Sequence, residues 1–197
     1  MPRIRRLGVR VYGVVAVGVV AVGVALGVLA PSGPLESRIS LVDHTVAMDP
    51  PADPGDGSLA DGDALTPFDV QDPAVGRLDP ALLSAIQHAA TAASVDGIAM
   101  TITSGWRSPE FQQQLLDNAV QTYGSLARAR EYVQTPEMSK HVIGQAVDVG
   151  GVGADQWLIA NGSRFGLCRI YANELWHFEL ATDAMGNCPP LLPNAAG

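Results

Sequence analysis

Positive charge is scarce in this sequence of 197 residues. Apart from Arg3, Arg5, Arg6 and Arg10 near the N-terminus it has no cluster of Lys or Arg, and Lys140 is its only lysine. The 12 basic residues are outnumbered by 20 acidic ones, so the formal net charge is −8. A protein that binds nucleic acid needs a basic patch to meet the phosphates. The composition therefore argues against a nucleic-acid partner.

Charge of either sign is absent from residues 11–30, which form a long apolar run. A helix of this length spans about 30 Å, the thickness of the hydrocarbon core of a bilayer. The arginines that precede the run predict a cytoplasmic N-terminus and an exported remainder. We therefore expect residues 1–30 to be a membrane anchor of a single-pass cell-membrane protein whose remainder is extracytoplasmic. A cleaved signal peptide is the alternative, although Pro31 is a poor residue to follow a cleavage site.

Large apolar side chains are few in residues 31–79. Ten acidic residues and two arginines occur there, among runs of Pro, Gly and Asp. Such a segment cannot bury enough apolar surface to offset its conformational entropy. We predict that residues 31–79 are an acidic, disordered linker. The folded domain is then expected at 80–190 and a C-terminal tail at 191–197.

Cysteine is limited to Cys168 and Cys188. An even number of cysteines in an exported chain favours one disulfide. Two free thiols, packed as small apolar side chains, are the alternative. We predict a Cys168–Cys188 disulfide, which in the chain-entropy model stabilises the fold by up to about 3 kcal/mol for a loop of this length.

Helical and strand patterns follow each other irregularly after residue 79. Apolar residues recur at helical spacing from Leu82 to Ala93, and Ser108-Pro109 is a typical start for a helix that runs to Tyr123. Without regular βαβ alternation, the pattern predicts an α+β domain with a small, mostly antiparallel sheet and flanking helices. The further expected elements are helices over 125–133 and 154–161 and strands over 98–103, 146–149, 169–172 and 176–180.

Two short motifs contain two of the four histidines. Residues 139–148 read Ser-Lys-His-Val-Ile-Gly-Gln-Ala-Val-Asp, and residues 174–177 read Glu-Leu-Trp-His. Together they supply His141, Asp148 and His177. Two imidazoles and one carboxylate leave a Zn(II) ion one open position, as hydrolytic zinc sites need. The sequence therefore predicts one Zn(II) ion on these three side chains, and two ordinary polar histidines are the alternative.

A further carboxylate accompanies this ligand set. Glu174 lies three residues before the last ligand, where a general base for a metal-activated water would sit. Strand alternation puts His177 and Glu179 on one face and Phe178 on the other, so Glu179 is the competing candidate. We prefer a supporting role for Glu179, because a fourth protein ligand would block the open position. Gly144 permits a tight bend between the first two ligands.

The two motifs together resemble the signature of the VanY-like family of zinc D-alanyl-D-alanine carboxypeptidases, which reads Ser-x-His-x-x-Gly-x-Ala-x-Asp and then Glu-x-Trp-His. The resemblance covers about 82–180 and implies a fold of the hedgehog/D,D-peptidase type. The segment Ser-Gly-Trp-Arg-Ser at 104–108 also resembles the family, and this implies that Arg107 stabilises the oxyanion. Ser139 is expected to bind the substrate's terminal carboxylate and Gln112 to line the same pocket. A purely structural role is the alternative for both.

The resemblance implies an enzyme that removes a terminal D-alanine from peptidoglycan stem peptides. With the anchor predicted from residues 1–30, we expect a membrane-tethered enzyme with a monomeric catalytic domain. An L,D-carboxypeptidase, a D,D-dipeptidase or a peptidoglycan endopeptidase could use the same site. A non-catalytic, zinc-containing module that binds cell-wall peptides is the alternative outside the enzymes. The presence of Glu174 and Arg107 argues against that module.

Overall fold

The structure is a computed structural model that describes residues 55–60 and 62–197. The expected membrane anchor at 1–30 and the first part of the expected linker, 31–54, lie outside these residues, so for them the predictions remain predictions. In the part of the chain that is described, none of the helices combines the length and the apolar character that a membrane span requires.

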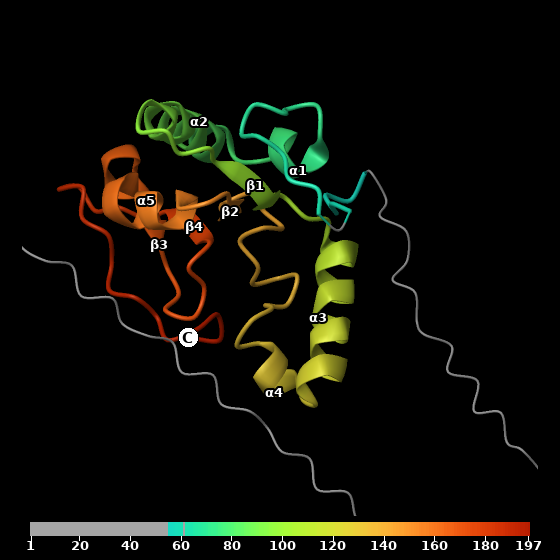
Figure 1. Cartoon of the computed structure of the whole chain (residues 1–197). Coiled ribbons are helices and arrows are strands. Elements are labelled where there is room, and N and C mark those ends of the chain that lie inside the picture. The colour runs from blue at the N-terminus through green and yellow to red at the C-terminus, as the bar shows by residue number, and fades with distance from the viewer. Residues whose placement is uncertain (1–54, 61) are drawn as a thin grey trace, which may run out of the picture. The chain divides into compact units, whose positions relative to one another are not determined.

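A four-stranded sheet forms the centre of the domain (Figure 1). Its strands follow the order β1-β2-β4-β3, and every neighbouring pair is antiparallel. The predicted α+β class with a small antiparallel sheet is therefore confirmed. Strands β2 and β4 are the two inner strands, so both of their edges are paired. The strands are β1 (Thr101–Ser104), β2 (Ala146–Gly150), β3 (Leu167–Arg169) and β4 (His177–Leu180).

The helices begin where the sequence carries capping residues. The Asp79 side chain accepts a hydrogen bond from the N–H of Ala81, and the Ser108 side chain accepts one from the N–H of Phe111. A proline follows each cap, and the predicted start of α3 at Ser108-Pro109 and the helix predicted from the spacing of Leu82 to Ala93, which is α2, are confirmed. The helices are α1 (Pro73–Gly76), α2 (Pro80–Val95), α3 (Pro109–Tyr123), α4 (Leu126–Ala129), α5 (Ala154–Asn161) and the 3₁₀ helix η1 (Gly162–Phe165).

Several predicted bounds differ from the observed ones; the strand expected over 98–103, for example, is β1 and begins at Thr101. Two further differences have a clear cause. The helix expected over 125–133 is only α4, which ends at Ala129, and the chain continues in turns that lead to the first histidine motif. The strand expected over 169–172 begins two residues earlier as β3. Leu167 is fully buried and pairs with Leu180, whereas the carbonyl of Ile170 accepts a hydrogen bond from a more distant part of the chain. Both differences arise from tertiary contacts rather than from local pattern.

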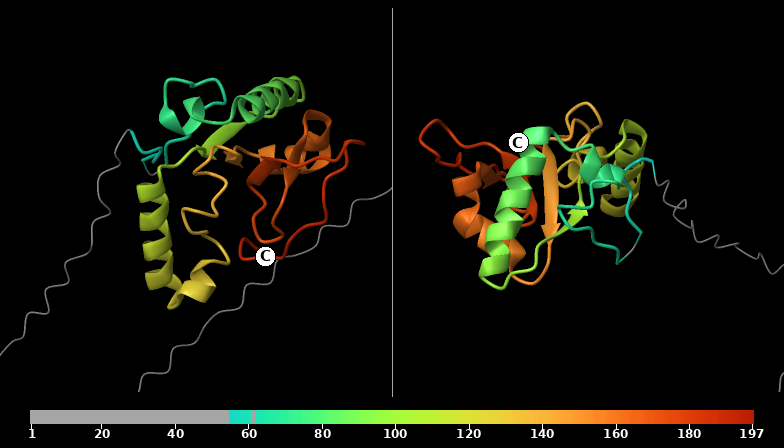
Figure 2. Two further views of the ribbon diagram at one scale, coloured as in Figure 1. Left: turned by 180° about the vertical axis from the view of Figure 1, so that it is seen from behind. Right: turned by 90° about the horizontal axis from the view of Figure 1, so that it is seen from above.

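One face of the sheet is apolar and the other is polar. Val147, Val149 and Phe178 point to the apolar face and belong to a core that also contains Leu82 of α2 and Leu158 of α5. In the view from above, α2 lies across the strands of this face (Figure 2). Since side chains alternate along a strand, the residues between them point to the opposite face. That polar face carries the histidine motifs.

The folded domain begins earlier than the sequence predicts. Val75 and Leu78 are buried members of the core. Leu65 forms a backbone bridge with Ile102 of β1, with N–H···O distances of 3.0 and 2.6 Å. The linker prediction is therefore wrong for residues 62–79, because Val75 and Leu78 are buried in the core and Leu65 packs against it.

Candidate active site

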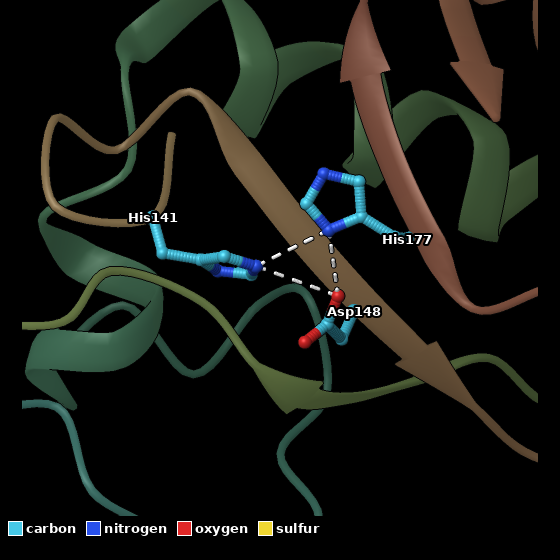
Figure 3. Close-up of side chains that lie close together, drawn as sticks. All are labelled: His141, Asp148 and His177. Atoms are coloured by element: carbon cyan, nitrogen blue, oxygen red, sulfur yellow. Dashed lines mark hydrogen bonds and ion pairs between the residues drawn. The ribbon is translucent and has the colours of Figure 1, made fainter. Parts of the chain in front are cut away.

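Three side chains converge on the polar face of the sheet (Figure 3). Asp148 comes from β2 and His177 from β4, and the register places these two residues directly opposite each other. His141 comes from the loop that precedes β2. The three possible ligand atoms all lie within 4.8 Å of one another, and all three residues are buried. The predicted ligand set is thus brought together in one cluster.

A glycine turn places His141 beside the sheet. Gly144 has a φ of +70°, and a Cβ atom there would lie 2.6 Å from the carbonyl oxygen of Arg77, so no other residue fits without a shift of the backbone. The Gly144 carbonyl accepts a hydrogen bond from the N–H of Asp79 (2.8 Å). The predicted bend is therefore present, and the start of α2 holds it in place.

Each imidazole is oriented by a hydrogen bond at the ring nitrogen that points away from the centre of the cluster. Nδ1 of His141 lies 2.7 Å from the carbonyl oxygen of Gly105, and Nε2 of His177 lies 3.0 Å from Oε1 of Glu179. Both partners are acceptors, so these outer ring nitrogens carry the protons. The inner nitrogens then face Oδ1 of Asp148, which lies 3.5 Å from His141 and 3.1 Å from His177. Glu179 occupies the supporting position behind a ligand that the sequence favoured.

The donor set fits a divalent metal ion. The inner nitrogens of His141 and His177 lie 3.3 Å apart, and two lone pairs at that separation repel each other unless a proton or a cation lies between them. Two imidazole nitrogens and one carboxylate oxygen match a three-ligand zinc site with one open position. These residues could therefore hold one Zn(II) ion.

The charges of the cluster are strongly coupled. Burial alone would raise the pKa of Asp148, but the neighbouring His141 and His177 hold it well below its usual range. Burial opposes protonation of His177, yet hydrogen bonds to Asp148 and Glu179 raise its pKa to about 9. Burial and the nearby Arg107 lower the pKa of His141. The carboxylates thus favour positive charge at the centre of the cluster, as a cation would supply.

Glu174 lies at the edge of the cluster and is buried. Its Oε2 is 3.8 Å from Nδ1 of His177, and its Oε1 has no hydrogen-bond partner among the residues that the structure describes. Burial raises the pKa of Glu174 to about 7. A carboxyl group with a pKa near neutrality suits proton transfer in both directions.

Arg107 connects the cluster to helix α3. Its Nη2 donates to Oδ2 of Asp148 (3.1 Å), its Nε to Oγ of Ser104 (2.8 Å) and its Nη1 to Oε1 of Gln112 (3.1 Å). The first of these bonds occupies the outer carboxylate oxygen and leaves Oδ1 free to face the histidines. Arg107 therefore also fixes the orientation of a ligand, which the sequence did not indicate.

A pocket of about 200 Å³ opens beside the cluster. Arg107, His141, Asp148, Glu174 and His177 form its charged end. The rest of the wall is largely apolar or aromatic, which is typical of a site for a small ligand. These other lining residues are Leu115, Tyr132, Val133, Gln134, Met138, Ser139, Lys140, Tyr171, Trp176 and Ala195.

The two predicted substrate-binding residues lie in different places. Ser139 lines the pocket, as the sequence suggested, whereas Gln112 does not. Gln112 is fully buried behind Arg107, and its Nε2 donates to the carbonyl oxygen of Gln134 (2.8 Å). Both ends of this amide are engaged within the protein, so the structure gives Gln112 the positioning role that was the alternative.

Sequence reasoning missed several residues of the pocket. The ring of Tyr171 lies 5.0 Å from that of His177, and the ring of Tyr132 stacks on that of Tyr123 at 4.7 Å. Burial raises the pKa of Tyr171 to about 12, so its hydroxyl remains a hydrogen-bond donor at neutral pH. The one signal in the sequence is the position of Tyr171 in the loop that leads to the second motif.

The predicted disulfide is confirmed. Cys168 of β3 and Cys188 are bonded, with their Cα atoms 5.5 Å apart. Cys168 is buried, and it pairs in the sheet with Glu179, the residue that supports His177. The bond attaches the C-terminal segment to the edge of the sheet that carries the site.

Comparison with known proteins agrees with the motifs. The family described as "VanY: D-alanyl-D-alanine carboxypeptidase" matches residues 76–181. A D-alanyl-D-alanine carboxypeptidase of Enterococcus faecalis (strain ATCC 700802 / V583) is 31% identical over 128 residues, which cover 52% of this chain and 48% of that protein. The chain thus spans about half the length of this curated relative.

Two solved structures are similar to the domain. VanYB in complex with D-alanine-D-alanine is 27% identical, with a TM-score of 0.50, over 67% of this chain and 80% of that one. A mutant of the D,D-pentapeptidase VanY from a VanB-type vancomycin resistance cassette, in complex with Zn(II), is 28% identical, with a TM-score of 0.49, over 64% of this chain and 78% of that one.

Proposed function

The chain belongs to the VanY family of D-alanyl-D-alanine carboxypeptidases, and from this premise we propose that it is a zinc-dependent enzyme that releases a terminal D-alanine from peptidoglycan stem peptides. One observation carries the proposal: three buried metal-ligand side chains converge beside Glu174 and Arg107 in a single pocket. The substrate class is supported by the curated relative, a D-alanyl-D-alanine carboxypeptidase, and by the structure of VanYB with D-alanine-D-alanine.

The metal is held by His141, Asp148 and His177 in this proposal. The atoms that they offer are Nε2, Oδ1 and Nδ1, which face one another within the cluster. When bound, zinc supplies a Lewis acid and lowers the pKa of a water molecule to about 7. Gly105 and Glu179 keep the two rings in the ligating orientation by accepting hydrogen bonds from their outer nitrogens.

Glu174 acts as the general base and then as the general acid. It takes a proton from the attacking water and delivers it to the leaving amine. Its Oε1, which accepts no hydrogen bond from the described residues, is available for that proton. A pKa of about 7, raised by burial, lets the same group bind and release a proton near neutral pH.

Arg107 stabilises negative charge on the scissile carbonyl oxygen. A guanidinium has five N–H donors, and three bonds to protein groups are made by Arg107. The remaining donors are available in the pocket, which Arg107 lines. Ser139, on the wall of the same pocket, binds the terminal carboxylate of the substrate.

The location of the enzyme is also part of the proposal. Residues 1–30 would anchor the chain in the cell membrane, with the catalytic domain on the extracytoplasmic side, where stem peptides are found. This part rests on the arginines and the uncharged run at 11–30 alone.

The test is a panel of defined muropeptides incubated with the zinc-loaded, full-length chain and followed by mass spectrometry. We expect loss of one D-alanine from pentapeptides that end in D-Ala-D-Ala, and no loss after treatment with a chelator. Release from tetrapeptides alone would indicate an L,D-carboxypeptidase, release of a dipeptide a D,D-dipeptidase, and cleavage of cross-links an endopeptidase. No cleavage of any member would leave the binding module as the better reading.

A further inference from the structure

The C-terminal part of the chain closes one side of the pocket. The family match ends at residue 181, yet Ala195 lines the pocket and is buried. We propose that residues 188–195, here named the C-terminal strap, are a specificity-determining wall of the pocket, held in place by the Cys168–Cys188 disulfide. The proposal rests on the proposed function, because it concerns the peptide that occupies the pocket.

The strap is fixed first to the β3–β4 side of the pocket. After the disulfide at Cys188 it runs back along the loop between β3 and β4 (Figures 1 and 2). Leu192 donates its N–H to the carbonyl oxygen of Ile170 (2.9 Å) and accepts from the N–H of Ala172 (2.8 Å). The residue between these two partners is Tyr171, which lines the pocket. The strap thus holds the loop that leads to the proposed general base.

The strap is also hydrogen-bonded to the opposite side of the pocket. Ala195 donates its N–H to the carbonyl oxygen of Glu131 (3.3 Å) and accepts a hydrogen bond from Nε2 of Gln134. Glu131 also accepts from Nδ2 of Asn173, in the β3–β4 loop (2.9 Å). The strap therefore joins two walls that lie far apart in the sequence.

A chain of hydrogen bonds leads from the strap to the charged end of the pocket. Gln134, which donates to Ala195, accepts with its own carbonyl oxygen from Nε2 of Gln112 (2.8 Å). Gln112 in turn accepts from Nη1 of Arg107 (3.1 Å). Displacement of the strap would therefore change the position of Arg107, through Gln134 and Gln112.

The position of the strap indicates what it selects. Gln134, Ser139 and Ala195 all line the pocket, and the carbonyl oxygen of Thr135, next to Gln134, accepts from the N–H of Ser139 (2.9 Å). From this connection we infer that Ala195 lies at the end of the pocket where the terminal carboxylate would bind. A wall at that end limits the size of the last residue and stops the peptide from continuing past it. The strap therefore favours a small terminal residue and favours removal of that residue over internal cleavage.

The test uses zinc-loaded, full-length protein and stem peptides that end either in D-alanine or in the bulky D-phenylalanine. Ala195→Trp would fill the pocket, and the matched control is Ala196→Trp, because Ala196 is exposed and lines no part of the pocket. We expect Ala195→Trp to weaken binding of the D-alanine peptide, measured by calorimetry, by about tenfold or more. Ala196→Trp should bind as the wild type does.

A second variant loosens the strap rather than filling the pocket. Replacement of both Cys168 and Cys188 by Ser should keep the zinc content and reduce the preference for D-alanine over D-phenylalanine, in both binding and kcat/KM. An unchanged dissociation constant in Ala195→Trp, or an unchanged preference in the double Ser variant, would overturn the proposal. Wild-type protein that binds the peptides without cleaving them refutes the proposed function, while the binding data still decide on the strap. If the wild type neither binds nor cleaves, both are overturned.

Discussion

Replacement of Glu174 by Gln gives the sharpest test of the mechanism, because it should change turnover and stability in opposite directions. The amide has nearly the same shape as the carboxylate but cannot accept the proton of the attacking water. Loss of a general base typically lowers turnover by about 10² to 10⁴. At about 1.4 kcal/mol for each tenfold, this is roughly 3–5 kcal/mol of transition-state stabilisation.

The stability of the same variant follows from the burial of Glu174. Burial raises its pKa from 4.5 to about 7 in the folded protein. The charged form is therefore disfavoured by folding, and the penalty grows as the pH rises from 4.5 to about 7 and stays constant above that. The difference between the two pKa values corresponds to at most about 3 kcal/mol. Gln carries no such penalty, so at pH 8 the chelated variant should be more stable than the chelated wild type.

Both effects can be measured on one preparation. Turnover is the release of D-alanine from a pentapeptide by the zinc-loaded protein, and stability is the midpoint of urea unfolding after chelation at pH 5 and pH 8. Glu110→Gln is the control, because Glu110 is exposed and lies outside the pocket. Wild-type turnover in a fully zinc-loaded Glu174→Gln protein would refute the role of this carboxylate, and Glu179 would become the first alternative.

Three further predictions concern the metal, the guanidinium and the N-terminus. His177→Ala should lose bound zinc, measured by elemental analysis, whereas His88→Ala should keep it because His88 is exposed; full occupancy in His177→Ala would contradict the ligand set. Arg107→Ala should raise the activation free energy of turnover by about 2.7–4 kcal/mol, as in comparable oxyanion sites. Equal rates of D-alanine release in variant and wild type would show that the guanidinium is not needed. N-terminal sequencing of the mature protein should find the original N-terminus, and a start near residues 28–32 would show that a signal peptide has been removed.

Local signals in the sequence predicted the parts of the fold that are locally determined. Ser108, followed by a proline, predicted the start of α3, and the apolar spacing from Leu82 to Ala93 predicted α2, in both cases without reference to the rest of the chain. The bounds of β3 could not be predicted, because they depend on Leu180 of the neighbouring strand. The linker prediction failed for residues 62–79, since composition is averaged over a segment and cannot show where a single Val75 will pack.

In the candidate site, too, the residues of local motifs could be predicted and those placed by tertiary contacts could not. The metal-ligand residues lie in two short motifs with recognisable spacing, so three of the side chains could be named before the fold was known. Ala195 belongs to no motif, and its place in the pocket depends on the disulfide and on hydrogen bonds of Leu192 and Ala195 to distant parts of the chain. Gln112 was correctly predicted to lie near the site, but its sequence position does not show that its amide accepts a hydrogen bond from Arg107.

The shared carboxylate of Asp148 would couple metal binding to the oxyanion stabilisation that we propose for Arg107. Its Oδ1 faces the two histidines and its Oδ2 accepts from Arg107, so a change in the guanidinium also releases a metal ligand from one of its restraints. Replacement of Arg107 therefore removes two functions together. Gln112→Leu separates them, because it removes the bonds that Gln112 makes to Nη1 of Arg107 and to the carbonyl oxygen of Gln134 but leaves both the guanidinium and its bond to Asp148. If Arg107 acts only by holding Asp148, Gln112→Leu should leave turnover nearly unchanged at full zinc occupancy. If its remaining donors must also be aimed at the substrate, turnover should fall while zinc content stays constant.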